Sequence, residues 1–386
     1  MDRNIGKNIK YIGCDDPSID LFESQYAVPN GVSYNSYVIL DEKVAVLDTA
    51  DGRVSEQWFA NLAAALGTRE PDYLIVSHME PDHARNIGRF LEKYPSAKIV
   101  GNAKTFVMFP QYFSDDISGR QIVVKEGDEL SLGEHTLAFI MAPMVHWPEV
   151  MMEYEKSEKI LFSADAFGKF GMLGTDEPWT DEARRYYCNI VGKYGSMVQG
   201  VLKKAAALDI KTVCPLHGPV LKGDLGLYLG KYDLWSRYVP EERGVVVAYA
   251  SIHGNTAGAA HILRDELEKA GEKTVLLDLA RCDMAEAVAQ VFRFDRLALL
   301  SCTYDAGLFP CMQDFLLHLR SKAVQGRTVG LVENGSWAPA AGKLMAEMLS
   351  SMKNMTVLDP VVTVRGAVKD DTMSALKALA AALHNR

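Results

Sequence analysis

The sequence lacks the signals of several protein classes. Its six cysteines form no Cys-x-x-Cys pair, which excludes a fused rubredoxin-type iron centre and favours a reduced setting. No apolar run approaches the length needed to cross a bilayer, and the first residues lack the apolar core of a signal peptide. We therefore expect a cytoplasmic protein without a membrane partner.

Charge and phosphate-binding motifs exclude further classes. A formal net charge of −9 over 386 residues gives no reason to expect a nucleic acid as a partner. The sequence contains no Gly-x-Gly-x-x-Gly and no Gly-Lys-Thr, so neither a dinucleotide site nor a Walker loop is indicated. The apolar and charged fractions, 48% and 24%, are those of a globular chain, and the length suits two or three domains.

Two patterns of secondary structure follow one another along the chain. Short strand-like runs come first, with helical patterns such as Ser55–Leu66 and Ala84–Lys93 between them, which favours an αββα-like sandwich. We interpret the polar stretch Ser236–Gly244 as a linker. The strands then alternate with helices, which predicts a doubly wound parallel sheet of five strands. The expected strands are Ser33–Leu40, Val44–Thr49, Tyr73–His78, Lys98–Gly101, Thr136–Pro143, Met151–Glu155, Ile160–Asp165 and Thr212–His217, followed by Val245–Tyr249, Thr274–Leu279, Leu297–Ser301, Thr328–Glu333 and Val357–Val364.

The most informative segment is His78-Met-Glu-Pro-Asp-His83, which holds four potential metal ligands directly after a strand-like run. A strand that leads into a short loop can direct several donor atoms at one place. Zinc hydrolases with this layout carry a histidine at the position of Glu80. A carboxylate there shifts the ligand set toward harder, redox-active metals such as iron or manganese.

Further ligand-type residues, His146, Asp165 and His217, follow the ends of other strand-like runs. Each of them alone is more often a hydrogen-bonded structural residue or a cap. Their recurrence beside a loop with four donor residues favours a shared two-metal site.

With these residues in this order, and with Tyr34-Asn-Ser-Tyr37 and Val145-His-Trp-Pro148 around them, the first part of the chain resembles the metallo-β-lactamase-like diiron domain of flavodiiron proteins (A-type flavoproteins). The resemblance implies that the catalytic iron ligands are His78, Glu80 and His146 for one iron, Asp82 and His217 for the other, and Asp165 as a bridge. His83 is the open member of the set, because it binds iron in some relatives and not in others.

A second constellation follows the predicted linker. The strand Val245–Tyr249 leads into a loop with hydroxyl groups and a glycine, and then into a helix. Such a loop offers backbone N–H groups and a helix N-terminus to a phosphate. It resembles the FMN-phosphate loop of flavodoxins and consists of Ser251, Ile252, His253, Gly254, Asn255 and Thr256.

The loops after the third and fourth strands are expected to hold the isoalloxazine ring, because a doubly wound sheet binds ligands at its strand carboxyl ends. Tyr304 and Trp337 are the aromatic candidates, with a packing role as the alternative for each. Cys302 and Asp305 replace a proline and an asparagine that are common among relatives, which bears on the potential of the flavin. The residues expected to bind FMN here are Ser301, Cys302, Thr303, Tyr304, Asp305, Gly307, Asn334, Gly335, Ser336 and Trp337.

The resemblance covers residues 1–240 as a metallo-β-lactamase-like diiron domain and residues 245–386 as a flavodoxin-like FMN domain. It implies an oxidoreductase that passes electrons from an external donor, a rubredoxin-like protein or reduced F420, through FMN to a non-haem diiron centre. This centre would reduce O2 to water, NO to N2O, or both, in a head-to-tail homodimer or a tetramer. Side chains such as Met144, Tyr187 and Tyr194 are candidates to influence the choice of gas.

Two alternatives stay open at this point. One is a zinc-dependent hydrolase of the metallo-β-lactamase fold with a regulatory flavodoxin domain. The other is an electron-transfer flavoprotein whose metal site has no function.

Overall fold

The computed structural model describes residues 3–386, and the contacts among them form two compact units. The first unit comprises the residues up to Tyr187 together with Ser196–Asp233, and the second comprises Cys188–Gly195 together with Leu234–Arg386. Within residues 3–386, no helix combines the length and the apolar character that crossing a membrane requires.

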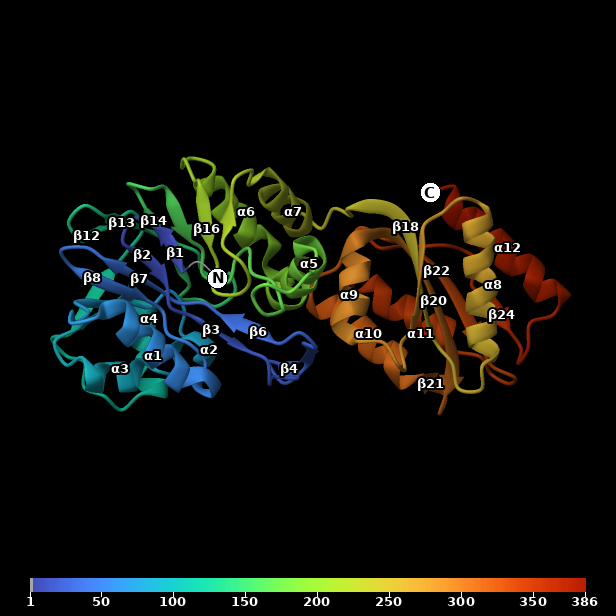
Figure 1. The fold of residues 1–386 in the computed structure, drawn as a ribbon. Coiled ribbons are helices and arrows are strands. Elements are labelled where there is room, and N and C mark those ends of the chain that lie inside the picture. The colour runs from blue at the N-terminus through green and yellow to red at the C-terminus, as the bar shows by residue number, and fades with distance from the viewer. Residues whose placement is uncertain (1–2) are drawn as a thin grey trace. The chain divides into compact units, whose positions relative to one another are not determined.

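Two sheets pack face to face in the first unit (Figure 1). The core between them contains Ile39, Leu47 and Val100 from one sheet and Phe139 and Phe162 from the other. The first sheet runs in the order β1 (Asn4–Gly6), β2 (Ile9–Tyr11), β7 (Tyr37–Leu40), β8 (Val44–Leu47), β9 (Tyr73–Ile75), β10 (Lys98–Asn102) and β11 (Gln121–Val124). The second runs in the order β12 (Glu129–Ser131), β13 (Thr136–Met141), β14 (Met151–Glu155), β15 (Ile160–Phe162), β16 (Thr212–Cys214) and β17 (Leu221–Lys222).

Helices cover the outer faces of both sheets, with α1, α3 and α4 beside the first sheet and α6 and α7 beside the second (Figure 1). Helix α1 forms where apolar side chains recur one turn apart, and it buries Trp58, Leu62 and Leu66. This arrangement confirms the predicted αββα sandwich. The remaining elements of the unit are β3 (Cys14–Asp16), β4 (Leu21–Phe22), β5 (Tyr26–Ala27), β6 (Val32–Tyr34), α1 (Ser55–Leu66), α2 (Pro81–Ala84), α3 (Ile87–Lys93), α4 (Ala103–Tyr112), α5 (Trp179–Ile190), α6 (Gly195–Ala205) and α7 (Gly226–Ser236).

The second unit contains a parallel sheet in the order β19-β18-β20-β22-β23. This order is that of a flavodoxin-like sheet and agrees with the doubly wound parallel sheet that the sequence predicts. Helices α8 and α12 lie on one face of the sheet, and α9 and α10 lie on the other (Figure 1). The elements are β18 (Glu242–Ala250), α8 (Asn255–Lys269), β19 (Thr274–Asp278), α9 (Met284–Arg293), β20 (Phe294–Tyr304), β21 (Gly307–Leu308), α10 (Pro310–Ser321), β22 (Thr328–Asn334), α11 (Ala341–Ser350), β23 (Thr356–Val357), β24 (Val362–Val364) and α12 (Asp370–His384).

Two details of this unit differ from the sequence prediction. The fifth strand is split into β23 and β24, because Pro360 lies between them and has no N–H group to donate to a neighbouring strand. Strand β18 begins at Glu242 and helix α7 ends at Ser236, so only part of the stretch predicted as a linker connects them.

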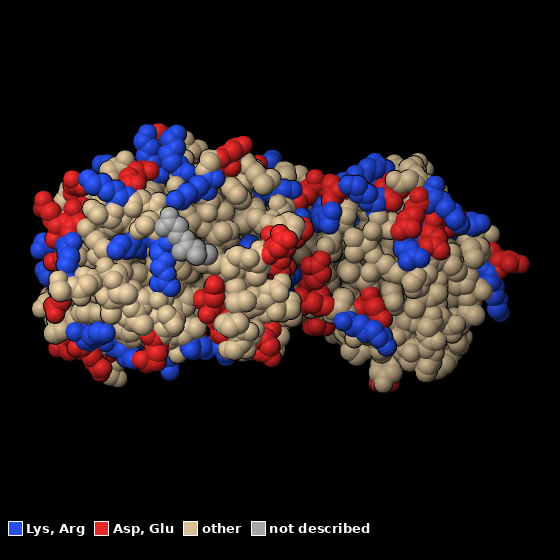
Figure 2. All heavy atoms as spheres, viewed as in Figure 1, with Lys and Arg blue, Asp and Glu red and all other residues tan. Residues whose placement is uncertain are grey.

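Acidic and basic side chains share the face of the molecule that Figure 2 shows. Surface ion pairs such as Lys204–Glu126 and Lys156–Glu129, with N–O distances of 2.6 and 2.8 Å, join charges from neighbouring elements. Exposed pairs of this kind add little to stability because water screens them.

One buried ion pair ties the second unit together. The Arg296 guanidinium donates to both carboxylate oxygens of Glu272, at 3.0 and 2.6 Å, and to the Leu383 carbonyl near the end of α12 at 2.7 Å. Burial opposes ionisation of Glu272, but Arg296, together with Arg243 and His384, outweighs it and holds the pKa of this carboxyl down to about 2. Glu272 is therefore ionised at neutral pH and anchors both β20 and α12.

We expect Glu272→Gln to lower the free energy of unfolding at pH 7 by about 3 kcal/mol, because the buried Arg296 guanidinium loses its bidentate partner and keeps only Asp295, at 3.1 Å, as a counter-charge. The folded pKa of about 2 lies below the ordinary value of 4.5. The stabilisation is therefore complete above pH 4.5 and disappears as the pH falls toward 2. Urea titrations across this range measure the difference between variant and wild type. The control is Glu266→Gln, which removes an exposed pair with Lys269 and should leave stability unchanged; an equal loss in both variants would contradict the prediction.

Candidate metal centre and flavin pocket

The candidate metal ligands meet at one rim of the sandwich, and elements of both sheets supply them. His78 and Glu80 follow β9, and Pro81 occupies the first position of the short helix α2 that carries Asp82 and His83. His146 lies in the loop between β13 and β14. Asp165 and His217 follow the parallel neighbours β15 and β16, whose carboxyl ends lie side by side.

Four donor atoms form the first group. The Nε2 atoms of His78 and His146 each lie 3.1 Å from Glu80 Oε2. Both nitrogens also lie 3.3 Å from Asp165 Oδ2. All four atoms are within 4.8 Å of one another, so they surround a single point.

The second group consists of Asp82, His83 and His217. The Nε2 atoms of His83 and His217 are 3.1 Å apart, and Asp82 Oδ2 lies 3.4 and 3.2 Å from them. Asp165 Oδ1 lies 3.6 Å from His217 Nε2. Asp165 thus presents one oxygen to each group.

The donor atoms fit two metal ions better than they fit hydrogen bonds. Asp165 Oδ2 and Asp82 Oδ1 are buried and have no hydrogen-bond partner among the described residues. His217 Nδ1 lies 2.8 Å from the Ser33 carbonyl and His78 Nδ1 lies 2.8 Å from Glu149 Oε1. These acceptors place the ring hydrogen on Nδ1, which leaves the Nε2 lone pair free for a metal.

Ionisation of two of the ligands, Glu80 and His83, agrees with this interpretation. Burial opposes the charge on Glu80, but His146 and His78 outweigh it and hold the pKa of this carboxyl down to about 2. Burial lowers the pKa of His83 to about 4, although Asp82 acts in the opposite direction. At neutral pH Glu80 is therefore a carboxylate and His83 a neutral imidazole, which are the forms that bind metals. Burial lowers the pKa of His146, but Asp165 and Glu80 outweigh it and raise this pKa to about 9, so a metal ion must displace a proton from His146.

Two buried carboxylates accept hydrogen bonds from the backbone of the ligand loop. Asp48 Oδ1 accepts the backbone N–H groups of Ser77 and His78 at 2.8 and 3.4 Å. Glu149 Oε1 accepts the N–H of Met79 at 2.8 Å in addition to its contact with His78. Sequence reasoning missed both residues, although Asp48 follows β8 just as Asp165 follows β15.

Aromatic rings enclose the histidines. Phe22, Tyr34 and Tyr186 surround the ring of His217, with centroids 5.3, 5.8 and 5.5 Å away, and Trp147 lies 5.1 Å from His78. Tyr187 and Tyr194 were predicted from sequence to influence the choice of gas, but neither is among these rings. Tyr187 packs against Tyr232, and Tyr194 belongs to the second unit.

The backbone is strained around the candidate ligands. Met144, Ala164 and Phe167, which flank His146 and Asp165, have φ angles of 64°, 49° and 68°. Non-glycine residues rarely adopt such angles, and strained residues of this kind concentrate at functional sites.

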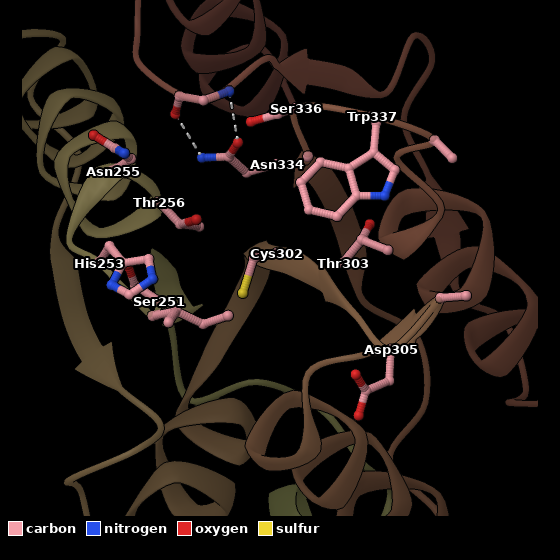
Figure 3. Close-up of a pocket in the computed structure, with 15 residues that line it drawn as sticks. Ser251, His253, Asn255, Thr256, Cys302, Thr303, Asp305, Asn334, Ser336 and Trp337 are labelled. Atoms are coloured by element: carbon pink, nitrogen blue, oxygen red, sulfur yellow. Dashed lines mark hydrogen bonds between the residues drawn. The ribbon is translucent and has the colours of Figure 1, made fainter.

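The flavin pocket is a cavity of about 250 Å³ at the carboxyl ends of β18, β20 and β22 (Figure 3). The Cys302 thiol donates to the Ala250 carbonyl with a distance of 3.7 Å, beside the start of the phosphate loop. Asn334 and Gly366 exchange two hydrogen bonds, at 2.9 and 3.1 Å, that fix one wall. The lining contains the predicted residues Ser251, Ile252, His253, Asn255, Thr256, Cys302, Thr303, Asp305, Asn334, Gly335, Ser336 and Trp337.

The pocket also differs from the sequence prediction. Ala306, Ala338 and Gly366 line it without having been predicted; Gly366 could have been found because it follows the fifth strand. Four predicted residues lie outside the lining: Gly254 caps α8 with a φ of 86°, Ser301 is buried within β20, and Tyr304 and Gly307 pair between β20 and β21.

The fold and the two sites define a two-domain flavoprotein with a metallo-β-lactamase-like metal domain. The family model of ODP family beta lactamase matches residues 32–218, and that of flavodoxin matches residues 247–381. The nitric oxide reductase of Moorella thermoacetica is 29% identical over 94% of this chain and 92% of its own length.

Solved structures show the same fold over the whole chain. The rubredoxin:oxygen oxidoreductase of Desulfovibrio gigas superposes with a TM-score of 0.91 at 24% identity, covering 99% of this chain and 97% of its own. The flavodiiron protein of Giardia intestinalis superposes with a TM-score of 0.90 at 24% identity, covering 100% and 96%. The chain therefore joins a domain of the ODP beta-lactamase family to a flavodoxin domain in the fold of flavodiiron proteins, and its flavin pocket and its two donor groups fit FMN and two metal ions.

We expect Gly254→Ala to weaken FMN binding about tenfold, because a side chain at a φ of 86° strains the phosphate loop by about 1–2 kcal/mol. Gly258→Ala is the matched control, since Gly258 lies inside α8 with no atom near its missing side chain. Fluorescence titration of the apoprotein with FMN measures both affinities. Equal affinity in the two variants would show that the Gly254 conformation does not matter to binding.

Proposed function

We propose that this protein takes electrons from an external donor through FMN and uses them at the diiron centre to reduce O2 to water, NO to N2O, or both. The observation that carries the proposal is the position of Asp165, which serves two donor groups in a chain that also has a flavin pocket. A carboxylate shared by two metals holds them close enough to act on one diatomic molecule.

The proposed ligand set places His78, Glu80 and His146 on one iron, Asp82, His83 and His217 on the other, and Asp165 between them. His83 is included because its Nε2 lies 3.1 Å from His217 Nε2. This equals the shortest distance between two donor atoms in the first group. When bound, the irons supply the redox steps and FMN supplies electrons one or two at a time.

Enclosure of the ligands supports chemistry on a small gas. His78, His83 and Asp165 are almost fully buried, whereas the side chains of Glu80 and Asp82 keep 17% and 12% of their exposure. A small molecule therefore reaches the centre past Glu80 and Asp82, while the aromatic rings beside His217 exclude bulk water from the other side.

The proposal extends to FMN contacts and partners. The loop Ser251–Thr256 would hold the phosphate, because backbone N–H groups at the start of α8 favour an anion. Trp337 at the pocket mouth is 82% exposed, which suits a ring that contacts FMN and a second surface. We propose a rubredoxin-like protein or reduced F420 as the donor, and a head-to-tail homodimer, alone or within a tetramer, as the assembly.

We expect Asp165→Ala to abolish reoxidation of the reduced flavin by O2 or NO, while reduction of FMN by a chemical reductant stays unchanged. The variant removes the carboxylate shared by both donor groups. Anaerobic stopped-flow measurement of flavin absorbance after mixing with each gas provides the rates, with exposed Asp116→Ala as the control. Slow reoxidation by both gases in iron-loaded wild type would refute the proposed function.

Metal content separates this function from a zinc hydrolase. Three carboxylates in the ligand set favour iron over zinc, whose sites in this fold carry a histidine at position 80. We expect purified wild type to hold iron in both positions and Glu80→His to raise the ratio of zinc to iron several-fold. Elemental analysis of both proteins from the same growth medium measures this; zinc in the wild type would favour the hydrolase.

A further inference from the structure

Glu153 is a carboxylic acid in the core between the two sheets. It lies at the centre of β14, on the same face as Met151 and Glu155, and is completely buried. Glu155 is satisfied there by Ser157, by the N–H of Glu158 and by His135. Glu153 lacks partners of that kind, and the proposed function makes no use of it.

The contacts of Glu153 lead to the metal-ligand loop. Its Oε2 lies 3.0 Å from the Ser77 hydroxyl, and its Oε1 has no hydrogen-bond partner among the described residues. Asp48 in turn accepts the N–H groups of Ser77 and His78. A chain of polar groups therefore runs from Glu153 through Ser77 and Asp48 to the backbone of His78.

Two carboxylates share this buried space, and in residues 3–386 neither forms an ion pair with a lysine or arginine. Like charges this close in the interior do not both ionise. Burial raises the pKa of Asp48 to about 7, although two backbone N–H groups stabilise its charged form, whereas Glu153 meets only one hydroxyl. Burial and the charge of Asp48 both raise the pKa of Glu153, so the proton resides on Glu153.

We propose that Glu153 is held as a neutral carboxylic acid and is a positioning residue for the metal-ligand loop. A neutral Glu153 donates to Ser77 Oγ, which fixes Ser77 beside Asp48, and it adds no second charge next to the carboxylate that holds the Ser77 and His78 N–H groups. An ionised Glu153 would repel the Asp48 carboxylate and so loosen His78.

The inference rests on the proposed metal site, because its effect is on metal affinity. Glu153→Gln keeps a neutral side chain with an N–H donor, whereas Glu153→Met keeps the size and removes the donor. We expect Glu153→Gln to bind iron within about twofold of wild type. We expect Glu153→Met to bind iron at least tenfold more weakly, as is typical when a partner behind the ligands is lost.

Anaerobic competition for Fe(II) against a chelator measures these affinities, and thermal unfolding of the metal-free proteins provides the control. An apolar residue in place of a buried acid does not lower stability, so Glu153→Met should unfold no earlier than wild type while binding iron less tightly. A parallel loss of stability and affinity would indicate a merely structural role. Wild-type affinity in Glu153→Met, or equally weak binding in Glu153→Gln, would also overturn the inference.

Infrared spectroscopy tests the protonation state without relying on metal binding. The wild type should show the carbonyl band of a neutral carboxylic acid at neutral pH, and Glu153→Gln should lose it. An unchanged spectrum would overturn the inference even if the protein reduces both gases, and the test stays decisive if Glu153→Met does not fold. Failure of wild type to bind iron would instead refute the proposed function and leave the infrared result standing.

Discussion

The structure depends on the crowding of imidazoles and carboxylates in a space that is largely buried. Donor atoms from His78, Glu80, Asp82, His83, His146, Asp165 and His217 approach one another to between 3.1 and 3.6 Å. The Nε2 atoms of His83 and His217 lie 3.1 Å apart and repel each other unless a proton or a metal ion lies between them. The centre is therefore built for metal, and metal binding contributes directly to the stability of the first unit.

The surrounding fold serves to keep these groups in place. Loops from both sheets supply the ligands, so the sandwich must form before the two donor groups can meet. Asp48 and Glu149 bind the backbone of the ligand loop, and strained residues such as Met144 and Ala164 aim the following side chains. The aromatic packing around His217 contributes favourable burial that offsets part of the cost of this strain and of burying the charges.

Much of this could be predicted from sequence, because the strongest signals are local. Helix Ser55–Leu66 and strand Met151–Glu155 are observed with the predicted bounds, and the ligand residues stand out because each follows an apolar strand. The short strands β3, β4 and β5 carry no period that could identify them. The pair β4 and β5 nevertheless brings Phe22 against His217, a contact between residues far apart in the chain.

Glu153 shows why alternation in a strand can mislead. A glutamate between Met152 and Tyr154 suggests a solvent-facing position, yet the side chain points into the core. The reason lies in Ser77 and Asp48, which come from another sheet and provide polar partners that the local sequence cannot reveal. Whether a polar residue can be buried inside a sandwich thus depends on the polar partners that the facing sheet provides.

The same logic of charge distinguishes this centre from a zinc site of the same fold. With Glu80 in place of a histidine, the ligand set contains three carboxylates, and each anionic ligand stabilises a more highly charged metal. Zinc has a single oxidation state and gains nothing from this difference. Iron gains a more accessible oxidised form, so the charge of Glu80 favours a centre that cycles electrons. A flavin pocket in the same chain gives those electrons a source, which is why one carboxylate in the ligand loop and one phosphate loop in the second unit are best understood together.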